Sequence, residues 1–445
     1  MDREARRWAP YIADVFSATS NWAGNQRWMP AERRTPRSVV ELAELVTDAH
    51  RAGRRVKAIG AGHSFTATAA TDGVQVSLDR LDQVVAIDEA RRQVTVGAGI
   101  RLHRLNDLLA AAGLALPNLG DIDRQSFAGA IATATHGTGL GLGNLATTVV
   151  GMQLVTGTGE VLRCRADLDP ELLRVARVGV GALGIVTEVT LQCVPAFDLH
   201  AHETVEVLDD VLDGFAEHAA AVDHFEFYWM PGTRRCQVKR NSRTDRPRAP
   251  QAQWAYVRDK WLGENVGFGL VCRVGRRFPT LTPRISRLVA SAAAERDLVD
   301  RSDRVFCSPR RVHFVEMEYG IPVEHLPEAV RRVRDLTADL PTPVLFPIEV
   351  RVSAEDEIPL STGFGRTSGW IAVHQYRGAP YEEYFAGVER IMDDYGGRPH
   401  WGKLHGQRSD TLAARYPQWD EFAAARDRLD PARTFANPYL DRVLG

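Results

Sequence analysis

The stretch Gly60-Ala61-Gly62-His63-Ser64-Phe65 decides the fold of this chain, because a glycine-rich turn stands directly after a strand-like run, residues 55–59. A segment with helical periodicity, Ser38 to Ala52, precedes that run. A helix, a buried strand and a Gly-x-Gly turn in this order favour a diphosphate cradle, since glycine lets backbone N–H groups approach phosphate oxygens. The turn therefore predicts a nucleotide-binding unit near the start of the chain.

The helix before the turn carries signals at both ends. Ser38 and Glu41 form a capping-box pair at its start, and Gly53 is placed to end it in a left-handed cap. The apolar residues of one helical face are Val39, Leu42, Val46 and Ala49.

The turn is not a Rossmann fingerprint, because Phe65 stands where the third glycine of Gly-x-Gly-x-x-Gly belongs. His63 is the unusual member. From the residues alone it has two readings: a polar turn residue, or a side chain that acts on the bound nucleotide.

Size and composition set the outer limits. A chain of 445 residues makes two or three domains, and 44% apolar with 25% charged residues is ordinary for a globular protein. A net charge of −2 gives no reason to expect nucleic acid or an anionic membrane as a partner. Residues 1–7 lead into no apolar segment, and no apolar run is long enough to span a bilayer, so we expect a cytoplasmic protein. The five widely spaced cysteines indicate neither a zinc site nor a disulfide framework.

The two halves of the chain differ in their expected strands, turns and helices. Up to about Pro195, short strands alternate with glycine-rich turns, and the strands on either side of Gly157-Thr158-Gly159 read as a hairpin. From about Phe197 onward, half-buried strands alternate with helices, which indicates an antiparallel sheet covered by helices on one side. The arginine-rich stretch 233–252 is expected to be a solvated loop, with a partner surface as the alternative. The expected strands are 74–78, 84–87, 94–97, 149–156, 160–164, 183–191, 225–229, 312–318, 344–352 and 370–376, and the expected helices are 102–112, 327–338 and 381–395.

A second unusual segment, residues 126–139, consists almost entirely of small or hydroxylated side chains. A backbone that lies flat against a ligand needs such residues, although a tightly packed core helix would use them too. Together with the first turn, this segment could clasp the diphosphate and ring system of a long dinucleotide from both sides.

Charged residues in two later strands are candidates for a site. Alternation places Glu349 and Arg351 on one face of their strand, where they form either a structural ion pair or part of a site. In the strand 370–376, alternation lets only one of His374 and Gln375 point inward.

Three motifs together resemble a known family. The turn 60–65, the run Ala-Gly-x-x-Ala-Thr-x-Thr-His-Gly-Thr-Gly at 128–139, and His400-Trp401-Gly402-Lys403 are similar to the signature set of the vanillyl-alcohol oxidase class of flavoproteins. Within that class they resemble the aldonolactone oxidoreductases, over almost the whole chain. The resemblance implies an α+β fold with an FAD-binding domain over 20–196, a substrate domain over 197–398, and a segment, 399–445, that returns to the flavin.

The resemblance also implies roles for single residues. His63 stands where the family's histidine bonds covalently to the flavin 8α-methyl group, although some members hold FAD without a bond. Lys403 would balance negative charge on the reduced flavin, where the residues alone also allow a surface lysine beside a core tryptophan. Glu349 and Arg351 would bind substrate and stabilise developing charge, and no metal is expected. The implied FAD contacts are His63, Gly60, Ala61, Gly62, Ser64, Phe65, Asn118, Gly120, Asp121, Ser126, Gly129, Thr133, Thr135, His136, Gly137, Ile185, His400 and Lys403, and the implied substrate contacts are Glu349, Arg351, His374 and Gln375.

The activity implied by the resemblance is FAD-dependent oxidation of a sugar 1,4-lactone such as L-gulono-1,4-lactone or D-arabinono-1,4-lactone. An alditol or xylitol oxidase is the alternative on the same scaffold, and a non-catalytic flavin-binding electron carrier is the alternative of another class. Related alditol oxidases have a serine where this chain has Asp121, which argues against a linear polyol. Gly120 permits oxygen as the acceptor but does not require it.

Overall fold

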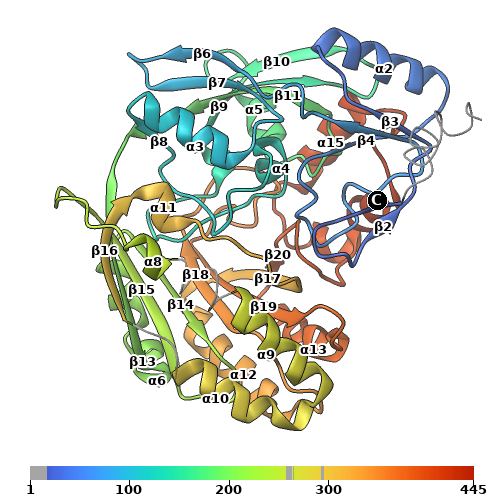
Figure 1. Ribbon diagram of the computed structural model, residues 1–445. Coiled ribbons are helices and arrows are strands. Elements are labelled where there is room, and N and C mark those ends of the chain that lie inside the picture. Colours follow the sequence, from blue (N-terminus) through green and yellow to red (C-terminus); the bar gives the residue numbers. More distant parts are fainter. Residues whose placement is uncertain (1–17, 257–262, 264, 292–294) are drawn as a thin grey trace, which may run out of the picture.

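The computed structural model describes residues 18–256, 263, 265–291 and 295–445 (Figure 1). The expectation for the first seven residues therefore lies outside the described part of the chain. Two groups of sheets form the molecule. The first half of the sequence builds a three-stranded sheet, a five-stranded sheet and two short strand pairs at one end, and the second half builds one eight-stranded sheet at the other (Figure 1).

The glycine turn follows the edge strand of a small parallel sheet. The helix before it, α2 (Val39–Arg51), starts as expected, because the Ser38 side chain accepts a hydrogen bond from the Glu41 N–H. A capping box would also have the Glu41 carboxylate accept a hydrogen bond from the Ser38 N–H. Here the carboxylate accepts one from the Arg37 N–H instead. Gly53 has φ +62°, the left-handed conformation of a C-terminal cap. The sheet has the order β3 (Glu32–Arg34), β5 (Val74–Ser77), β4 (Val56–Ile59).

A five-stranded antiparallel sheet packs beside it. The predicted hairpin is confirmed as β9 paired with β10 across the turn 156–160. The strand order is β10 (Val161–Arg165), β9 (Val149–Val155), β11 (Ile185–Gln192), β7 (Gln93–Gly97), β6 (Val84–Asp88). The helices of this half are α2, α3 (Leu102–Ala111), α4 (Phe127–Ala132) and α5 (Pro170–Ala176), and two short strand pairs are β1 (Thr19–Ser20) with β2 (Arg27–Trp28) and β8 (Leu114–Ala115) with β12 (Val194–Pro195).

The second half forms an eight-stranded antiparallel sheet. Its order is β16 (Arg296–Arg301), β13 (Asp198–Val207), β15 (Arg235–Thr244), β14 (His224–Trp229), β18 (Ile348–Ser353), β19 (Ser368–Tyr376), β17 (Phe314–Pro322), β20 (Arg398–Pro399). The helices of the second half are α6 (Leu208–Asp213), α7 (Phe215–Ala220), α8 (Gln253–Tyr256), α9 (Phe268–Arg277), α10 (Thr282–Ser291), α11 (Ser302–Phe306), α12 (Leu326–Asp339), α13 (Glu382–Asp393), α14 (Ser409–Ala413), α15 (Trp419–Leu429) and α16 (Pro438–Leu444).

The expectation of a solvated loop over 233–252 is wrong for its first part. Residues 235–244 form β15, which pairs with β13 on one side and β14 on the other. Cys236 and Val238 are buried, while the remaining side chains are mainly polar. Backbone pairing on both edges holds this strand in spite of its loop-like composition.

The two faces of the large sheet differ in chemistry. Phe225, Phe227 and Trp229 of β14 contribute to a hydrophobic core with α6, α7, α12 and α13, as do Val350 of β18 and Val373 of β19. The side chains between them in sequence lie on the opposite face, which points toward the first half of the molecule. Helices therefore cover one face as expected, except that Phe268 of α9 reaches the opposite face and lines a cavity there.

The carboxyl-terminal segment returns to the first half of the chain. Val56 N–H donates to Thr434 O, and the buried Lys57 Nζ donates to Phe435 O at 3.1 Å. Asp430 is buried and accepts hydrogen bonds from the backbone N–H groups of Thr434 and Phe435. The parallel sheet and its core are thus completed by residues from the end of the chain.

This closure predicts that Gly157→Ala is destabilising. A Cβ at Gly157 would lie 2.1 Å from Asp430 Oδ1 and 2.9 Å from Asp430 Cα, so the turn that holds residues 434 and 435 must move. We expect a loss of about 1–3 kcal/mol, the range for overpacked sites, measured by thermal and urea unfolding. The control is Gly141→Ala, where a Cβ meets nothing within 4 Å. Equal stability of the two variants would contradict the prediction.

Candidate functional site

The glycine turn presents backbone donors to a crevice. None of the N–H groups of residues 61–64 donates a hydrogen bond to another residue that the structure describes. A Cβ at Gly60 would lie 2.1 Å from Ser126 Oγ, so the turn and the small-residue segment are in close contact. Gly62 has φ +69°, a conformation that favours glycine. Half-buried donors without protein partners require an acceptor from a ligand or water.

Three adjoining cavities form one long crevice beneath this turn. Two of them share Gly60, Ser126, Gly129 and Ile185 as lining residues. The second also contains Ala61, Gly62, His63, Ser64 and Thr133, and His63 extends into a third cavity. The crevice therefore runs from β11 past the turn to the open face of the large sheet, and both small-residue segments line it.

The third cavity collects most of the remaining predicted residues. They are Phe65, Gly120, Asp121, Thr135, His136, Glu349, Arg351, His374, His400 and Lys403. Asn118 and Gly137 lie behind the wall, where the Asn118 amide donates to Thr138 O and a Cβ at Gly137 would meet Asn118. The Gln375 side chain is turned away from the cavity and bonds to Pro380 O, so alternation selects His374 as the residue that faces inward.

His63 is held as a neutral side chain. Burial, with Arg101 acting in the same direction, lowers the pKa of His63 to about 4. Its ring stacks on Trp22, with centroids 5.6 Å apart. A neutral imidazole has a free nitrogen lone pair, which a bond to an electrophilic carbon requires.

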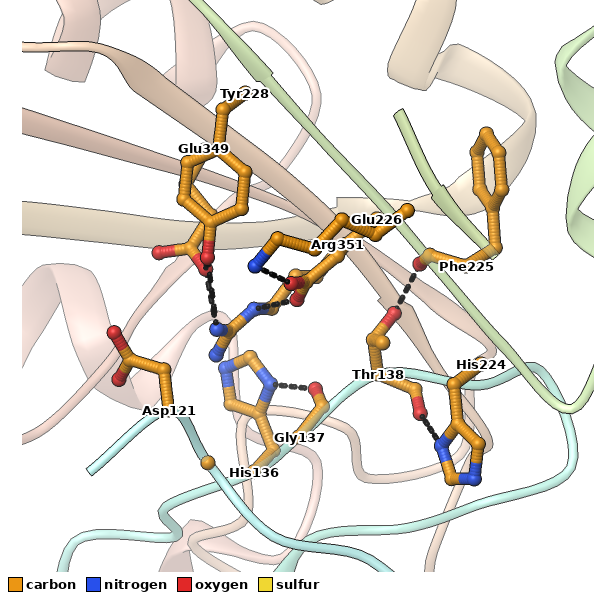
Figure 2. A network of polar contacts seen from close by, with 12 residues as sticks. Asp121, His136, Gly137, Thr138, His224, Phe225, Glu226, Tyr228, Glu349 and Arg351 are labelled. Carbon is orange, nitrogen blue, oxygen red and sulfur yellow. Dashed lines mark hydrogen bonds and ion pairs between the residues drawn. The ribbon is translucent and has the colours of Figure 1, made fainter. Parts of the chain in front are cut away.

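Glu349 and Arg351 form the centre of a buried charge network on the open face of the sheet. Register places Arg351 beside Glu226 and Glu349 beside Tyr228 on the next strand. Arg351 contacts Glu349 directly, and its Nε donates to Glu226 Oε2 at 2.9 Å (Figure 2). The Tyr228 hydroxyl donates to Glu349. Burial raises the pKa of Glu349 against the opposing effect of Arg351.

Lys239 completes this network from β15, the strand that was expected to be a loop. Its Nζ donates to Glu226 Oε1 at 2.9 Å. Although burial alone would raise the pKa of Glu226, Lys239 and Arg351 hold it at about 2. Glu226 is therefore a carboxylate that binds two cations and fixes the Arg351 guanidinium from behind.

Lys403 lies between two buried carboxylates. Its Nζ contacts Glu316 and lies 3.8 Å from Glu318 Oε2. Burial lowers the pKa of Lys403, but the two glutamates more than compensate and raise it. His374 Nε2 lies 3.4 Å from Glu316 Oε1, and His136 Nε2 lies 3.5 Å from Glu318 Oε2. The ammonium group therefore stays charged inside the protein.

His400 and Trp401 have different roles beside Lys403. Burial lowers the pKa of His400 to about 3, although Glu318 opposes this effect. Its Nδ1 accepts a hydrogen bond from Gly402 N–H, which fixes the bend that aims Lys403. Trp401 is buried in the core of the first half and donates to Leu360 O.

Asp121 forms a pair that the sequence did not reveal. Arg310 donates to Asp121 Oδ2 from Nε at 3.1 Å and from Nη2 at 2.7 Å. Burial alone would raise the pKa of Asp121. The nearby charges of Arg310, Arg351 and Lys403 outweigh burial and hold this pKa below its usual range. Both members of the pair line the cavity.

Among the described residues, two clusters have the spacing of metal ligands. They are His136, Glu318 and His400, and Glu316, Glu349 and His374. Buried carboxylates need a positive partner. Lys403 supplies that partner to one carboxylate of each cluster, Glu318 in the first and Glu316 in the second.

The cavity and the charge network behind it contain functional candidates that sequence reasoning missed. Glu316 and Glu318 belong to a strand whose alternation had been read only as half-buried, and Glu226, Tyr228, Lys239 and Arg310 carried no motif. A signal did exist for the strand residues: Glu226, Glu316 and Glu318 alternate with large apolar residues, as Glu349 does.

The residues fit an FAD molecule. Unpartnered N–H groups at the turn suit a diphosphate, small residues on both sides of the crevice leave room for extended rings, and a fixed cation, Lys403, lies at its far end. Consistent with this, residues 30–165 match an FAD-binding domain family.

The fold is that of flavoenzymes of the vanillyl-alcohol oxidase type. A cholesterol oxidase from Brevibacterium sterolicum superimposes with a TM-score of 0.82 at 18% identity, covering 96% of this chain and 97% of the other. Residues 189–443 match the D-arabinono-1,4-lactone oxidase family, and the chain belongs to that family. It is 46% identical to an L-gulono-1,4-lactone dehydrogenase of Mycobacterium tuberculosis (strain CDC 1551 / Oshkosh), over 96% of this chain and 99% of the relative. It is 33% identical to an L-gulonolactone oxidase of Scyliorhinus torazame, over 95% and 97%.

Proposed function

We propose that this protein oxidises an aldono-1,4-lactone, of the L-gulono- or D-arabinono-1,4-lactone type, in an FAD-dependent reaction. The observation that carries the proposal is the buried Glu349–Arg351 pair, which faces the same cavity as Lys403 at the end of the FAD-shaped crevice. The names of the relatives, which act on L-gulonolactone, support this substrate class.

The chain's own residues divide the chemistry among them. FAD, when bound, supplies the hydride acceptor at N5. Glu349 binds a substrate hydroxyl, and Arg351, held by Glu226, stabilises negative charge that develops on the substrate oxygen. Lys403 offsets negative charge on the reduced cofactor, and the hydroxyl proton leaves to a base or to solvent. His374, which Glu316 orients, contributes a further polar contact.

This assignment of roles also gives the proposed domain boundaries. Residues 20–196 form the FAD-binding domain, residues 197–398 form the substrate domain, and residues 399–445 return to the flavin site. Within the described residues, no helix has the length and apolar character needed to cross a bilayer.

Oxidation of a linear polyol on the same scaffold is the second candidate. Asp121 weighs against it, because Arg310 holds this carboxylate in the cavity wall where the related alditol oxidases have a serine. Oxygen remains one of the acceptors we propose: Gly120 lines the cavity, and the absence of a side chain at this position leaves room for oxygen beside the flavin.

The first test is anaerobic reduction of the bound flavin. L-gulono-1,4-lactone should bleach the oxidised flavin absorbance, and xylitol at the same concentration should not, because only the lactone matches the proposed site. Bleaching by xylitol alone would establish the polyol oxidase. A flavin that neither compound reduces would support a non-catalytic carrier.

Glu349→Gln tests the role of the carboxylate. The change keeps the shape and the Tyr228 contact while it removes the charge, so kcat should fall about 100-fold or more, as for loss of a positioned polar catalyst. Stability should change far less, because Arg351 keeps Glu226 as an ionic partner. Steady-state kinetics and thermal unfolding measure the two effects.

The matched control for this variant is Glu203→Gln on β13. Glu203 is also a buried strand carboxylate and accepts from the Gln237 amide at 2.7 Å, but it does not line the cavity. It should leave kcat within about twofold of the parent, since it has no part in transition-state binding. If Glu349→Gln turned over as fast as this control, the assignment would be lost.

Covalent attachment of FAD through His63 is the third test. Neutral His63 lines both the turn cavity and the cavity with Lys403, which supports a bond to the flavin edge. Acid denaturation should leave the yellow chromophore on the polypeptide, and His63→Ala should release it into the supernatant. A colourless pellet from the parent protein would refute the bond while leaving FAD binding itself intact.

A further inference from the structure

A separate cavity of about 380 Å³ shares no lining residue with the cavity that contains Glu349 and Lys403, which is called the catalytic cavity below. It is bounded by α9, the segment before β17 and the turn after β19, and its lining includes Arg273, Arg276, Arg311, Arg377 and His313. Its volume falls within the 300–1,000 Å³ range of small-molecule sites. No carboxylate is among the described residues that line it. Among the described residues, the charge that the lining supplies is therefore that of its arginines.

Three of these arginines lack an ionic partner within the part of the chain that the structure describes. Arg273, Arg276 and Arg377 form no ion pair with any residue in the described ranges, and the Arg276 guanidinium bonds only to the carbonyl oxygen of Arg377. By contrast, Arg301, Arg310 and Arg351 are each paired with a carboxylate. Like charges that converge without counter-charges repel one another, so an anion bound among them is stabilised.

Ring contacts connect this cavity to the catalytic one. His313 stacks on Trp22 with centroids 4.7 Å apart, and Trp22 stacks on His63 at 5.6 Å. Trp22 and His63 both line the catalytic cavity, whereas His313 lines the cationic one. Only two ring contacts therefore separate the cationic cavity from the proposed flavin attachment residue.

We infer that the cationic cavity binds a small anionic electron acceptor, one that carries carboxylate, phosphate or sulfonate groups, and that it serves reoxidation of the enzyme. The inference rests on the proposed flavoenzyme activity. Reoxidation removes two electrons from the reduced cofactor: two acceptor molecules gain one electron each, and one proton leaves to solvent. The arginines attract the acceptor and raise its local concentration beside Trp22.

The binding step is tested without turnover. Ferrocyanide, a tetravalent anion already in its reduced form, is titrated calorimetrically into the oxidised holoenzyme. The double variant Arg273→Gln/Arg276→Gln should weaken its Kd about tenfold or more, since two cavity charges are lost. The matched control, Arg277→Gln/Arg284→Gln, removes two exposed charges from α9 and α10 that do not line the cavity, and should change Kd less than twofold.

The electron-transfer step is tested on photochemically reduced enzyme, so the result does not depend on the sugar substrate. The second-order rate constant for oxidation by ferricyanide should fall about tenfold in the cavity variant but not in the control, with a steep dependence on ionic strength. Oxidation by the cationic hexaammineruthenium(III) should not slow. Equal ferrocyanide affinity in both variants would overturn the site. Weakened binding with unchanged ferricyanide oxidation would overturn its role in reoxidation.

Discussion

The charges of Glu226, Glu349 and Arg351 on the open face of the large sheet are buried, and a buried charge is tolerated only where it is paired. This constraint determines the arrangement around the catalytic cavity. Lys239, Glu226, Arg351 and Glu349 alternate in sign across three neighbouring strands, so each group is held by the next. Removal of Arg351 would take from Glu349 the counter-charge that it contacts, and the side chains at the centre of the network therefore have little freedom to move.

The alternation of side chains along β14 and β18 places the charged residues on one face of the sheet and the core residues on the other. In β14 and β18, each residue between two charged or polar ones is a large apolar residue that packs against α6, α7, α12 or α13. A shift of one residue in register would exchange the two faces and bury the charges against the helices. Packing of the helices and geometry of the site are consequently fixed by one choice of register.

Regular elements with strong local signals were predictable from sequence, and pairing across the sheet was not. Ser38, Glu41 and Gly53 mark the ends of α2 by local chemistry, and alternation correctly favoured a single inward residue between His374 and Gln375. Residues 235–244 lack the apolar alternation of a strand, because their stability comes from backbone pairing with two neighbours that are distant in sequence. Arg310 was missed for a related reason: its partner Asp121 is almost two hundred positions away.

The return of the carboxyl terminus has a consequence for biosynthesis. Lys57 and Val56, directly before the glycine turn, bond to Phe435 and Thr434, and the Asn437 amide donates to carbonyl oxygens at Ala67 and Thr68. A nascent chain lacks these partners until residues 434–437 have left the ribosome. The nucleotide cradle is therefore completed late in synthesis, and a chain interrupted before residue 434 would lack the partners of the strand that leads into the glycine turn.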